Sequence, residues 1–372
     1  MIRVVLVDDE PPARHRMRQL LDAAGDVAIV GEAGSAVEAR EVIRKTRPDL
    51  LFLDVEMPEV RGTALAAELP EPRPFIVFAT AFDHYALDAI GVEATDYLLK
   101  PVSRAKLTAT LDRVRTRLAT QLVARDVAAA STVQAHLWPG TLPSIPGFDC
   151  AAASLPARGV GGDFYDVFPT GAEQATTGQA NRWALLLGDA SGKGVAAGLV
   201  ASAVQARVNA AARHGQLDPA TLVAAVDRDV YATTDGARYA TAIYASLDLA
   251  RANLTVVNAG HPALLIFSPH TDIVERVEAT GPALGLIEAG RYEARTVPLA
   301  PGTILVAVTD GVTEAQNEAG EEFGDDVLHQ LLKDSGQASA KHMCESVLAA
   351  VRLHRGPRQD QDDVTVMVVK AR

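Results

Sequence analysis

Residues Ala184–Gly194 read Ala-Leu-Leu-Leu-Gly-Asp-Ala-Ser-Gly-Lys-Gly, and this stretch decides how the second half of the chain is interpreted. An apolar run ends abruptly at Gly188-Asp189, and a turn of small residues follows. This pattern predicts a buried strand that ends in one carboxylate. Such a carboxylate is costly to desolvate unless a cation or hydrogen bonds satisfy it.

Three other segments place acidic residues beside an apolar run in the same way. They are Gly161–Asp166 with Asp163, Ile304–Gly311 with Asp310, and Asp362-Asp363 before Val364–Val369. A single aspartate after a strand most often forms a turn, and for any one of these segments alone that interpretation stays open. Four such segments together predict a shared site of oxygen ligands for hard cations.

Two similar motifs can be excluded. Gly188–Gly194 is one residue too short for a phosphate-binding P-loop and has no Ser or Thr after Lys193. The run Gly161–Tyr165 is similar to the Gly-Gly-Asp-Glu-Phe signature of cyclic-dinucleotide synthases, but Phe164 stands in place of its acidic fourth residue.

The composition narrows the class of protein. The 372 residues leave room for about two or three domains. A hydrophobic content of 48% and a charged content of 22% are typical of globular domains with sizeable cores. Residues 1–120 carry 16 basic and 19 acidic residues, a net charge of −3, and the remainder carries 19 and 28, a net charge of −9. Neither part is basic, so we expect no nucleic-acid partner.

The cysteines and the apolar runs indicate a compartment. Cys150 and Cys344 are too few for a disulfide framework, which suits a reducing cytoplasm. We expect no signal segment and no membrane-spanning run. The sequence therefore predicts a cytoplasmic protein without a membrane partner.

Strands alternate with helical stretches in the first 118 residues, which predicts an α/β fold with a doubly wound parallel sheet. In such a sheet the carboxyl ends of the strands form the site. The polar residues at predicted strand ends are Asp8, Asp9, Asp54, Thr80 and Lys100.

These five residues suit phosphoryl transfer. Asp54 would be the nucleophile, while Asp8 and Asp9, with a backbone carbonyl near Glu56, would hold a divalent cation. Lys100 would pair with the phosphoryl oxygens, and Thr80 would form a hydrogen bond to the group. The alternative is that these residues are turn acids and a surface lysine.

Residues 1–118 resemble a response-regulator receiver domain. The matching text is Val7–Glu10, Leu53–Pro58, Ala79–Ala81 and Tyr97–Pro101. The resemblance implies phosphorylation of Asp54 by a sensor histidine kinase, Mg²⁺ held by Asp8, Asp9 and Asp54, a cis bond before Pro101, and Thr80 with Tyr97 as a switch pair. Ala81–Leu87, which includes His84, is most similar to receivers attached to LytTR-type DNA-binding modules, but no such module follows.

A helical linker is predicted between the two halves, at residues 119–137. An apolar stripe enters it from the last receiver helix, formed by Leu107, Leu111, Val114, Leu118 and Leu122. The stripe either packs on its own domain or forms a short dimer seam. The helix must end before Pro139.

Residues 138–372 alternate short strands with turns and helix pairs, which predicts two sheets flanked by helices. The expected strands are 164–168, 183–187, 239–247, 254–258, 263–267, 304–308 and 364–369. The expected helices are 196–212, 219–231, 325–332 and 339–353.

This region resembles the bacterial PPM-type serine/threonine phosphatases, in their sporulation and sigma-factor-regulator branch. The matching text is Val160–Asp166, Gly188–Gly194, Asn258–Pro262, Thr309–Glu314 and Asp362–Thr365. The resemblance implies an αββα sandwich with two Mn²⁺ or Mg²⁺ ions between its sheets.

The same resemblance assigns the ligands. Asp189 would bridge the ions with help from the Ala190 carbonyl, Asp310 and Asp362 would bind one ion, and Asp163 would complete or gate the site. Asp363 could be the ligand instead of Asp362. The two ions would activate a water for in-line attack on a phosphomonoester.

Two further residues have weaker claims. Arg158 is a candidate for holding the substrate phosphate, as an arginine does in eukaryotic relatives. His261 could act as a general acid, although its motif more often serves structure in this branch.

We therefore expect a response regulator, working as a homodimer, whose output is a metal-dependent phosphatase. Relatives act on a phosphorylated anti-anti-sigma (STAS) protein in a partner-switching pathway, and transfer of that substrate is analogy. The alternative is a catalytically silent scaffold that binds the STAS partner. A transcription factor is disfavoured by the acidic second half.

Overall fold

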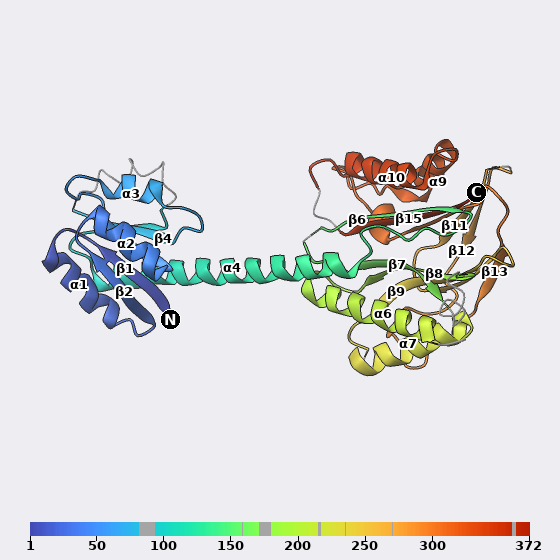
Figure 1. Cartoon of the computed structure of the whole chain (residues 1–372), viewed down its shortest axis with the longest axis horizontal. Coiled ribbons are helices and arrows are strands. Elements are labelled where there is room, and N and C mark those ends of the chain that lie inside the picture. The colour runs from blue at the N-terminus through green and yellow to red at the C-terminus, as the bar shows by residue number, and fades with distance from the viewer. Residues whose placement is uncertain are drawn as a thin grey trace. The chain divides into compact units, whose positions relative to one another are not determined.

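The computed structural model describes residues 1–81, 94–157, 159–170, 180–214, 217–234, 236–269, 271–358 and 362–372. The chain divides into two compact units, Met1–Ala124 and Arg125–Arg372. Helix α4 (Arg104–Leu137) begins in the first unit and ends in the second (Figure 1). Its end at Leu137 agrees with the stop expected before Pro139.

The first unit is the predicted doubly wound domain. Its parallel sheet has the strand order β2-β1-β3-β4-β5. The strands are β1 (Ile2–Val7), β2 (Val27–Ala33), β3 (Leu50–Asp54), β4 (Phe75–Thr80) and β5 (Asp96–Leu99). The helices that complete it are α1 (Pro11–Asp22), α2 (Ala36–Thr46), α3 (Gly62–Glu68) and the first part of α4.

Each face of this sheet has its own core, because side chains alternate along a strand. Val5 and Val7 of β1 face a cluster that includes residues of α2 and α3. Val4 and Leu6 face a cluster that includes residues of α1 and α4.

The apolar stripe of α4 is not one continuous dimer seam. Leu107, Leu111 and Val114 are buried in the second of these clusters, and Leu118 packs against it. These residues therefore pack on their own domain, as the first of the two interpretations has it, because α4 covers that face of the sheet. Leu122 is 59% exposed, and the exposed apolar residues farther along α4 are Val123, Val133 and Leu137.

The second unit is the predicted αββα sandwich (Figure 1). One sheet has the order β13-β10-β9-β8-β7, and the other has the order β12-β11-β14-β15-β6. The first contains β7 (Asp163–Thr170), β8 (Arg182–Ala190), β9 (Ala240–Asp248), β10 (Asn253–Ala259) and β13 (Arg295–Pro298). The second contains β6 (Phe148–Leu155), β11 (Leu264–Ser268), β12 (Ile273–Val277), β14 (Ile304–Val308) and β15 (Val364–Ala371).

Helices cover the outer face of each sheet (Figure 1). Helices α6 (Val195–His214) and α7 (Pro219–Thr234) pack on the sheet that contains β8. Helices α9 (Gly324–Asp334) and α10 (Ala340–Arg355) pack on the other, and the short α8 (Asp310–Thr313) follows β14. Strands β6, β12 and β13 were missed by the sequence analysis.

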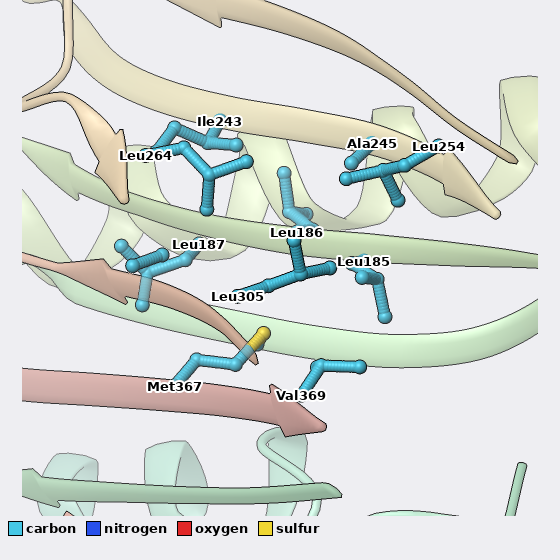
Figure 2. Close-up of a pocket in the computed structure, with 11 residues that line it drawn as sticks. Leu185, Leu186, Leu187, Ile243, Ala245, Leu254, Leu264, Leu305, Met367 and Val369 are labelled. Carbon is cyan, nitrogen blue, oxygen red and sulfur yellow. The ribbon is translucent and has the colours of Figure 1, made fainter. Parts of the chain in front are cut away.

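The stretch quoted first explains the sandwich. Leu185 and Leu187 of β8 point into the core between the sheets, whereas Ala184 and Leu186 belong to the core under α6 and α7. Both faces of β8 are buried, so the run is apolar throughout. Figure 2 shows the inter-sheet side chains, which enclose an apolar cavity of about 20 Å³. That space is far too small for a substrate.

Among the described helices, α6 is long and apolar enough to cross a membrane by length and composition alone, over Val195–Arg213. The sequence analysis had not expected such a run. The high hydropathy has a local cause, since Ala197, Ala201 and Val204 of α6 are fully buried against the sheet.

Candidate functional site

Three carboxylates meet at the carboxyl edge of the receiver sheet. Asp8 follows β1 with Asp9 next to it, and Asp54 ends β3. Their ligand oxygens all lie within 4.8 Å of one another, the one such group of three among the described residues. Parallel strands bring these ends together as expected. Hard oxygen donors at this spacing fit one Mg²⁺ ion.

Lys100 reaches this cluster from the end of β5. Its Nζ lies 2.6 Å from Oδ2 of Asp54 and 2.6 Å from Oδ2 of Asp8. Burial raises the pKa of Asp54, and Asp8 adds to the rise, while Lys100 opposes both. Burial alone would lower the pKa of Lys100, but its hydrogen bonds to Asp54 and Asp8 raise it overall. The lysine therefore stays charged and neutralises part of the cluster.

The predicted switch residues lie on the adjacent strands. Thr80 ends β4 and is buried, and its carbonyl accepts a hydrogen bond from the Lys100 amide. The Tyr97 ring stacks on Phe78 at 5.4 Å, and its buried hydroxyl has no hydrogen-bond partner among the described residues. The cis bond expected before Pro101 is present. His84 lies outside the described residues.

In the second unit, Asp163 begins β7 directly opposite Asp189 of β8. Asp163 is 2% exposed, and its Oδ2 accepts hydrogen bonds from the hydroxyls of Thr309 at 2.9 Å and Thr365 at 2.6 Å. Thr309 directly follows β14, and Thr365 lies in β15. Asp163 thus joins the two sheets at one edge.

Asp310 and Asp362 lie at that same edge, because β14 and β15 are antiparallel neighbours. Asp310 follows the end of β14 and Asp362 precedes the start of β15. Burial, and then Asp310 and Asp362, raise the pKa of Asp189 to about 7. Burial and Asp362 also raise the pKa of Asp310. The acids repel one another, which is the electrostatic signature of a site that binds cations.

A glycine lets the backbone approach these acids closely. A Cβ atom at Gly162 would lie 2.7 Å from Oδ1 of Asp189 and 2.7 Å from the Ala190 carbonyl oxygen. Those are the two oxygens that the resemblance assigns to the bridging position. The two oxygens therefore lie near one another, and carboxylate and carbonyl oxygens are donors that divalent ions prefer.

The structure separates the roles of Asp362 and Asp363. Both oxygens of Asp363 accept backbone hydrogen bonds, from Ala157 and from Gly162, each at 2.7 Å. The carboxylate of Asp362 instead accepts from the Asp363 amide and lies 3.0 Å from Lys193 Nζ. Asp363 therefore fastens the backbone before Asp163, while Asp362 contacts its neighbour's amide and the half-exposed Lys193.

His261 is held in the core. It is 4% exposed, with Nδ1 2.8 Å from the Thr241 hydroxyl and Nε2 3.1 Å from the Val308 carbonyl oxygen. Burial lowers its pKa to about 3. Both ring nitrogens are used and the ring stays neutral, so this geometry favours the structural role. Arg158 lies outside the described residues.

Two further residues of the site, Thr309 and Thr365, are not predicted from the sequence. Each lies within three residues of an acid in the quoted motifs, but nothing in the sequence indicates that both reach Asp163. Gln134 of α4 is a further contact, since its side chain donates to the Gly161 carbonyl at 2.8 Å and accepts from the Gly161 amide at 3.0 Å. This pair ties α4 to the segment that carries Asp163.

Comparison with known families gives two matches. Residues 4–112 match the response regulator receiver domain, and residues 179–372 match stage II sporulation protein E (SpoIIE). Among curated proteins, the transcriptional regulatory protein BtsR of Salmonella typhi is 52% identical over 116 residues, which cover 31% of this chain and 48% of BtsR. The chain thus spans about half the length of the curated relatives it matches.

Two solved structures support the fold of the second unit. The SiaA-PP2C domain of Pseudomonas aeruginosa has a TM-score of 0.58 at 23% identity and covers 68% of this chain and 98% of that one. The RsbU and RsbW domains of a Mycobacterium tuberculosis protein have a TM-score of 0.52 at 26% identity and cover 63% of each chain.

Proposed function

Because this chain belongs to the stage II sporulation protein E (SpoIIE) family and carries a response regulator receiver domain, we propose that it is a response regulator whose output is a metal-dependent protein serine/threonine phosphatase. The observation that carries this proposal is the meeting of Asp163, Asp189, Asp310 and Asp362 at one edge of the sandwich. Their mutual repulsion, and the closeness of Asp189 Oδ1 to the Ala190 carbonyl oxygen beside Gly162, support a metal site.

We propose that Asp189, assisted by the Ala190 carbonyl, would hold two Mn²⁺ or Mg²⁺ ions. Asp310 and Asp362 hold one ion, and Asp163 completes the site. The bound ions supply an activated water and neutralise the phosphoryl oxygens. Thr309 and Thr365 fix the orientation of Asp163, and Asp363 holds the backbone of Gly162 in place. We prefer Asp362 over Asp363 because two backbone amides fix Asp363, whereas Oδ2 of Asp362 faces only the half-exposed Lys193.

The experiment that tests the proposal is hydrolysis of p-nitrophenyl phosphate with and without Mn²⁺. We expect Asp189→Asn to lower turnover by at least about a thousandfold, the equivalent of about 4 kcal/mol of transition-state stabilisation. Asp272→Asn is a matched control, because Asp272 is an exposed acid paired with Lys333. Equal turnover by wild type and Asp189→Asn would remove the assignment. A chain that binds a STAS partner without any Mn²⁺-dependent hydrolysis would be the scaffold instead.

The receiver supplies the input. Asp54 accepts a phosphoryl group from a sensor histidine kinase, Asp8, Asp9 and Asp54 hold Mg²⁺, and Lys100 pairs with the phosphoryl oxygens. Thr80 contacts the phosphoryl group, and Tyr97 follows it as the second residue of the switch. The position of Tyr97 on β5, beside the strand that ends at Thr80, supports this pairing.

The substrate is a phosphorylated anti-anti-sigma (STAS) protein, and the setting is partner switching in the cytoplasm. Support comes from the family and from the likeness to a structure that contains RsbU and RsbW domains. The decisive measurement is turnover of a phospho-STAS protein by the full chain with and without a beryllofluoride-modified receiver.

We propose a receiver at residues 1–118, a linker at 119–137 and a phosphatase at 138–372. Helix α4 connects the receiver to the phosphatase.

The chain works as a homodimer through the exposed apolar residues Leu122, Val123 and Val133. Phosphorylation changes the geometry of this pair, and Gln134 passes the change to Gly161, raising activity. Two glycines inserted near Leu118 should keep basal hydrolysis and abolish the response to beryllofluoride. A full response in that variant would make α4 only a tether.

A further inference from the structure

The last turn of α10 carries a buried arginine that the metal-site description leaves without a role. Arg355 is 4% exposed, an unusual state for a guanidinium group. Its Nη1 donates to the Asp362 carbonyl at 3.0 Å, and its Nη2 donates to the Gly311 carbonyl at 2.9 Å. One side chain therefore holds two separate loops.

Those two loops, the single turn that forms α8 and the stretch before β15, carry Asp310 and Asp362. Gly311 follows Asp310 directly, and the other acceptor is the carbonyl of Asp362 itself. The loops approach so closely that a Cβ atom at Gly311 would lie 1.8 Å from the Asp363 carbonyl oxygen. The planar fork of a guanidinium suits two acceptors at fixed spacing, whereas a lysine offers a single ammonium.

A buried charge is an expensive way to close two loops. Burial lowers the pKa of Arg355, and Asp362, Asp363 and Asp163 favour its charged form. Its Nε atom is buried and has no hydrogen-bond partner among the described residues. Such a group is weak evidence for stability by itself, so its position between the two acid-bearing loops points to a role in the site.

We propose that Arg355 is a positioning residue for the metal centre. Its guanidinium fixes the Asp310 and Asp362 loops at the separation that their shared divalent ion requires, and it acts through the two backbone carbonyls without touching ion or substrate. The inference rests on the proposed function, because it assigns those acids to one ion. Residues that orient metal ligands in this way typically change metal affinity by about 10- to 100-fold when they are replaced.

The surroundings of Arg355 allow a direct test. Arg355 lines a cavity of about 330 Å³, together with Leu155, Pro156, Ala157, Val351, Arg352 and Val364. Truncation to alanine extends this cavity up to the two carbonyls. Free guanidinium ion, which has the same planar donors, can then enter the space that the side chain occupied.

The experiment measures Mn²⁺ binding to the full chain by calorimetry and by the Mn²⁺-induced rise in melting temperature. We expect Arg355→Ala to weaken Mn²⁺ affinity by about tenfold or more. At saturating Mn²⁺, we expect kcat for p-nitrophenyl phosphate to fall with little change in KM. Millimolar guanidinium chloride, well below denaturing concentrations, should restore affinity and kcat in this variant and leave wild type unchanged.

Arg352→Ala is the matched control, since it removes a positive charge from the wall of the same cavity. We expect it to bind Mn²⁺ as wild type does. If Arg355→Ala fails to fold, Arg355→Lys replaces it, and we expect weakened Mn²⁺ affinity there without rescue. Wild-type Mn²⁺ affinity in a folded Arg355 variant, or an equal loss in Arg352→Ala, would overturn the inference.

Binding and hydrolysis are measured separately, so the two proposals fail in different ways. A wild-type chain that binds Mn²⁺ through Arg355-dependent loops but hydrolyses no phosphomonoester would contradict the phosphatase function alone. A wild-type enzyme whose Mn²⁺ affinity ignores Arg355 would contradict the positioning role alone.

Discussion

The two acidic clusters of this chain use the same residue type and treat its charge differently. In the receiver, Lys100 lies 2.6 Å from oxygens of both Asp8 and Asp54. In the phosphatase, Lys193 meets Asp362 at 3.0 Å with both side chains half exposed, and the pKa of Asp189 rises to about 7. The receiver thus holds a lysine directly on two of its acids, while the cations of the phosphatase site reach Asp362 through a half-exposed pair with Lys193 and a backbone contact of Arg355. The lysine beside the receiver acids suits a site that accepts a transient phosphoryl group. The weaker counter-charge of the phosphatase acids suits a site that keeps its metal ions through many turnovers.

The largest expected effect separates the two clusters completely. Asp54→Asn should abolish labelling of the full chain by a small phosphodonor with Mg²⁺, because the amide cannot act as the nucleophile. Basal Mn²⁺-dependent hydrolysis should persist, since Asp54 belongs to the other unit. Phosphodonor labelling followed by intact-mass measurement checks the first part. A label retained in this variant would place the nucleophile elsewhere.

Removal of metal should destabilise the phosphatase more than the receiver, because the two acidic clusters differ in counter-charge. At Mn²⁺ about 100-fold above its dissociation constant, we expect the ions to stabilise the phosphatase by about 2.7 kcal/mol relative to chelator. Urea unfolding of the full chain measures the difference. Asp310→Asn should lose most of this stabilisation, whereas Asp9→Asn should lose little, because Asp9 belongs to the other unit and Lys100 neutralises part of its cluster. The opposite order in these two variants would refute the comparison.

Much of this contrast could be predicted from sequence, because strand ends are local features. Asp54 and Asp189 each follow an apolar run, and in a layered fold such ends converge at one edge. The doubly wound domain, the sandwich and the acid clusters follow from that regularity. The missed strand β6 pairs with β15 and reads Phe-Asp-Cys-Ala-Ala-Ala-Ser-Leu, whose small residues have weak strand preference.

The residues that orient the acids could not be predicted, because their contacts join distant parts of the chain. Thr365 is 202 positions from Asp163, and Arg355 is 44 positions from Gly311. The apolar stripe of α4 shows the same limit. Its 3- and 4-residue spacing fits a receiver core or a dimer seam equally well. The stripe packs in the receiver core because α4 covers one face of the sheet.

A smaller effect concerns pH in the absence of metal. The folded pKa of Asp189 is about 7, above its unfolded value near 3.9, so the folded state takes up a proton first as the pH falls. Without metal, stability should therefore rise as the pH falls from 8 to 6, by up to about 1.4 kcal/mol per pH unit below 7. Urea midpoints in chelator check this against Asp189→Asn, whose midpoint should rise less than that of wild type as the pH falls. Saturating Mn²⁺ should abolish the trend, and a wild-type slope equal to that of the variant would contradict it.

The smallest expected effect has the opposite sign and comes from His261. Its folded pKa of about 3 lies below the unfolded value near 6.5, so between these values only the unfolded chain binds the proton. Stability should fall as the pH drops from 6.5 to 5.5, by about 1 kcal/mol for this residue. The Asp189→Asn background in chelator removes the opposing contribution of that acid. In that background, His261→Gln is the matched variant, because an amide can still donate to the Val308 carbonyl and accept from Thr241. We expect the urea midpoint to fall more steeply with His261 than with glutamine. If the urea midpoints of the two proteins change with pH in parallel, the His261 ring is protonated in the folded protein. That result would reopen a proton-transfer role for His261.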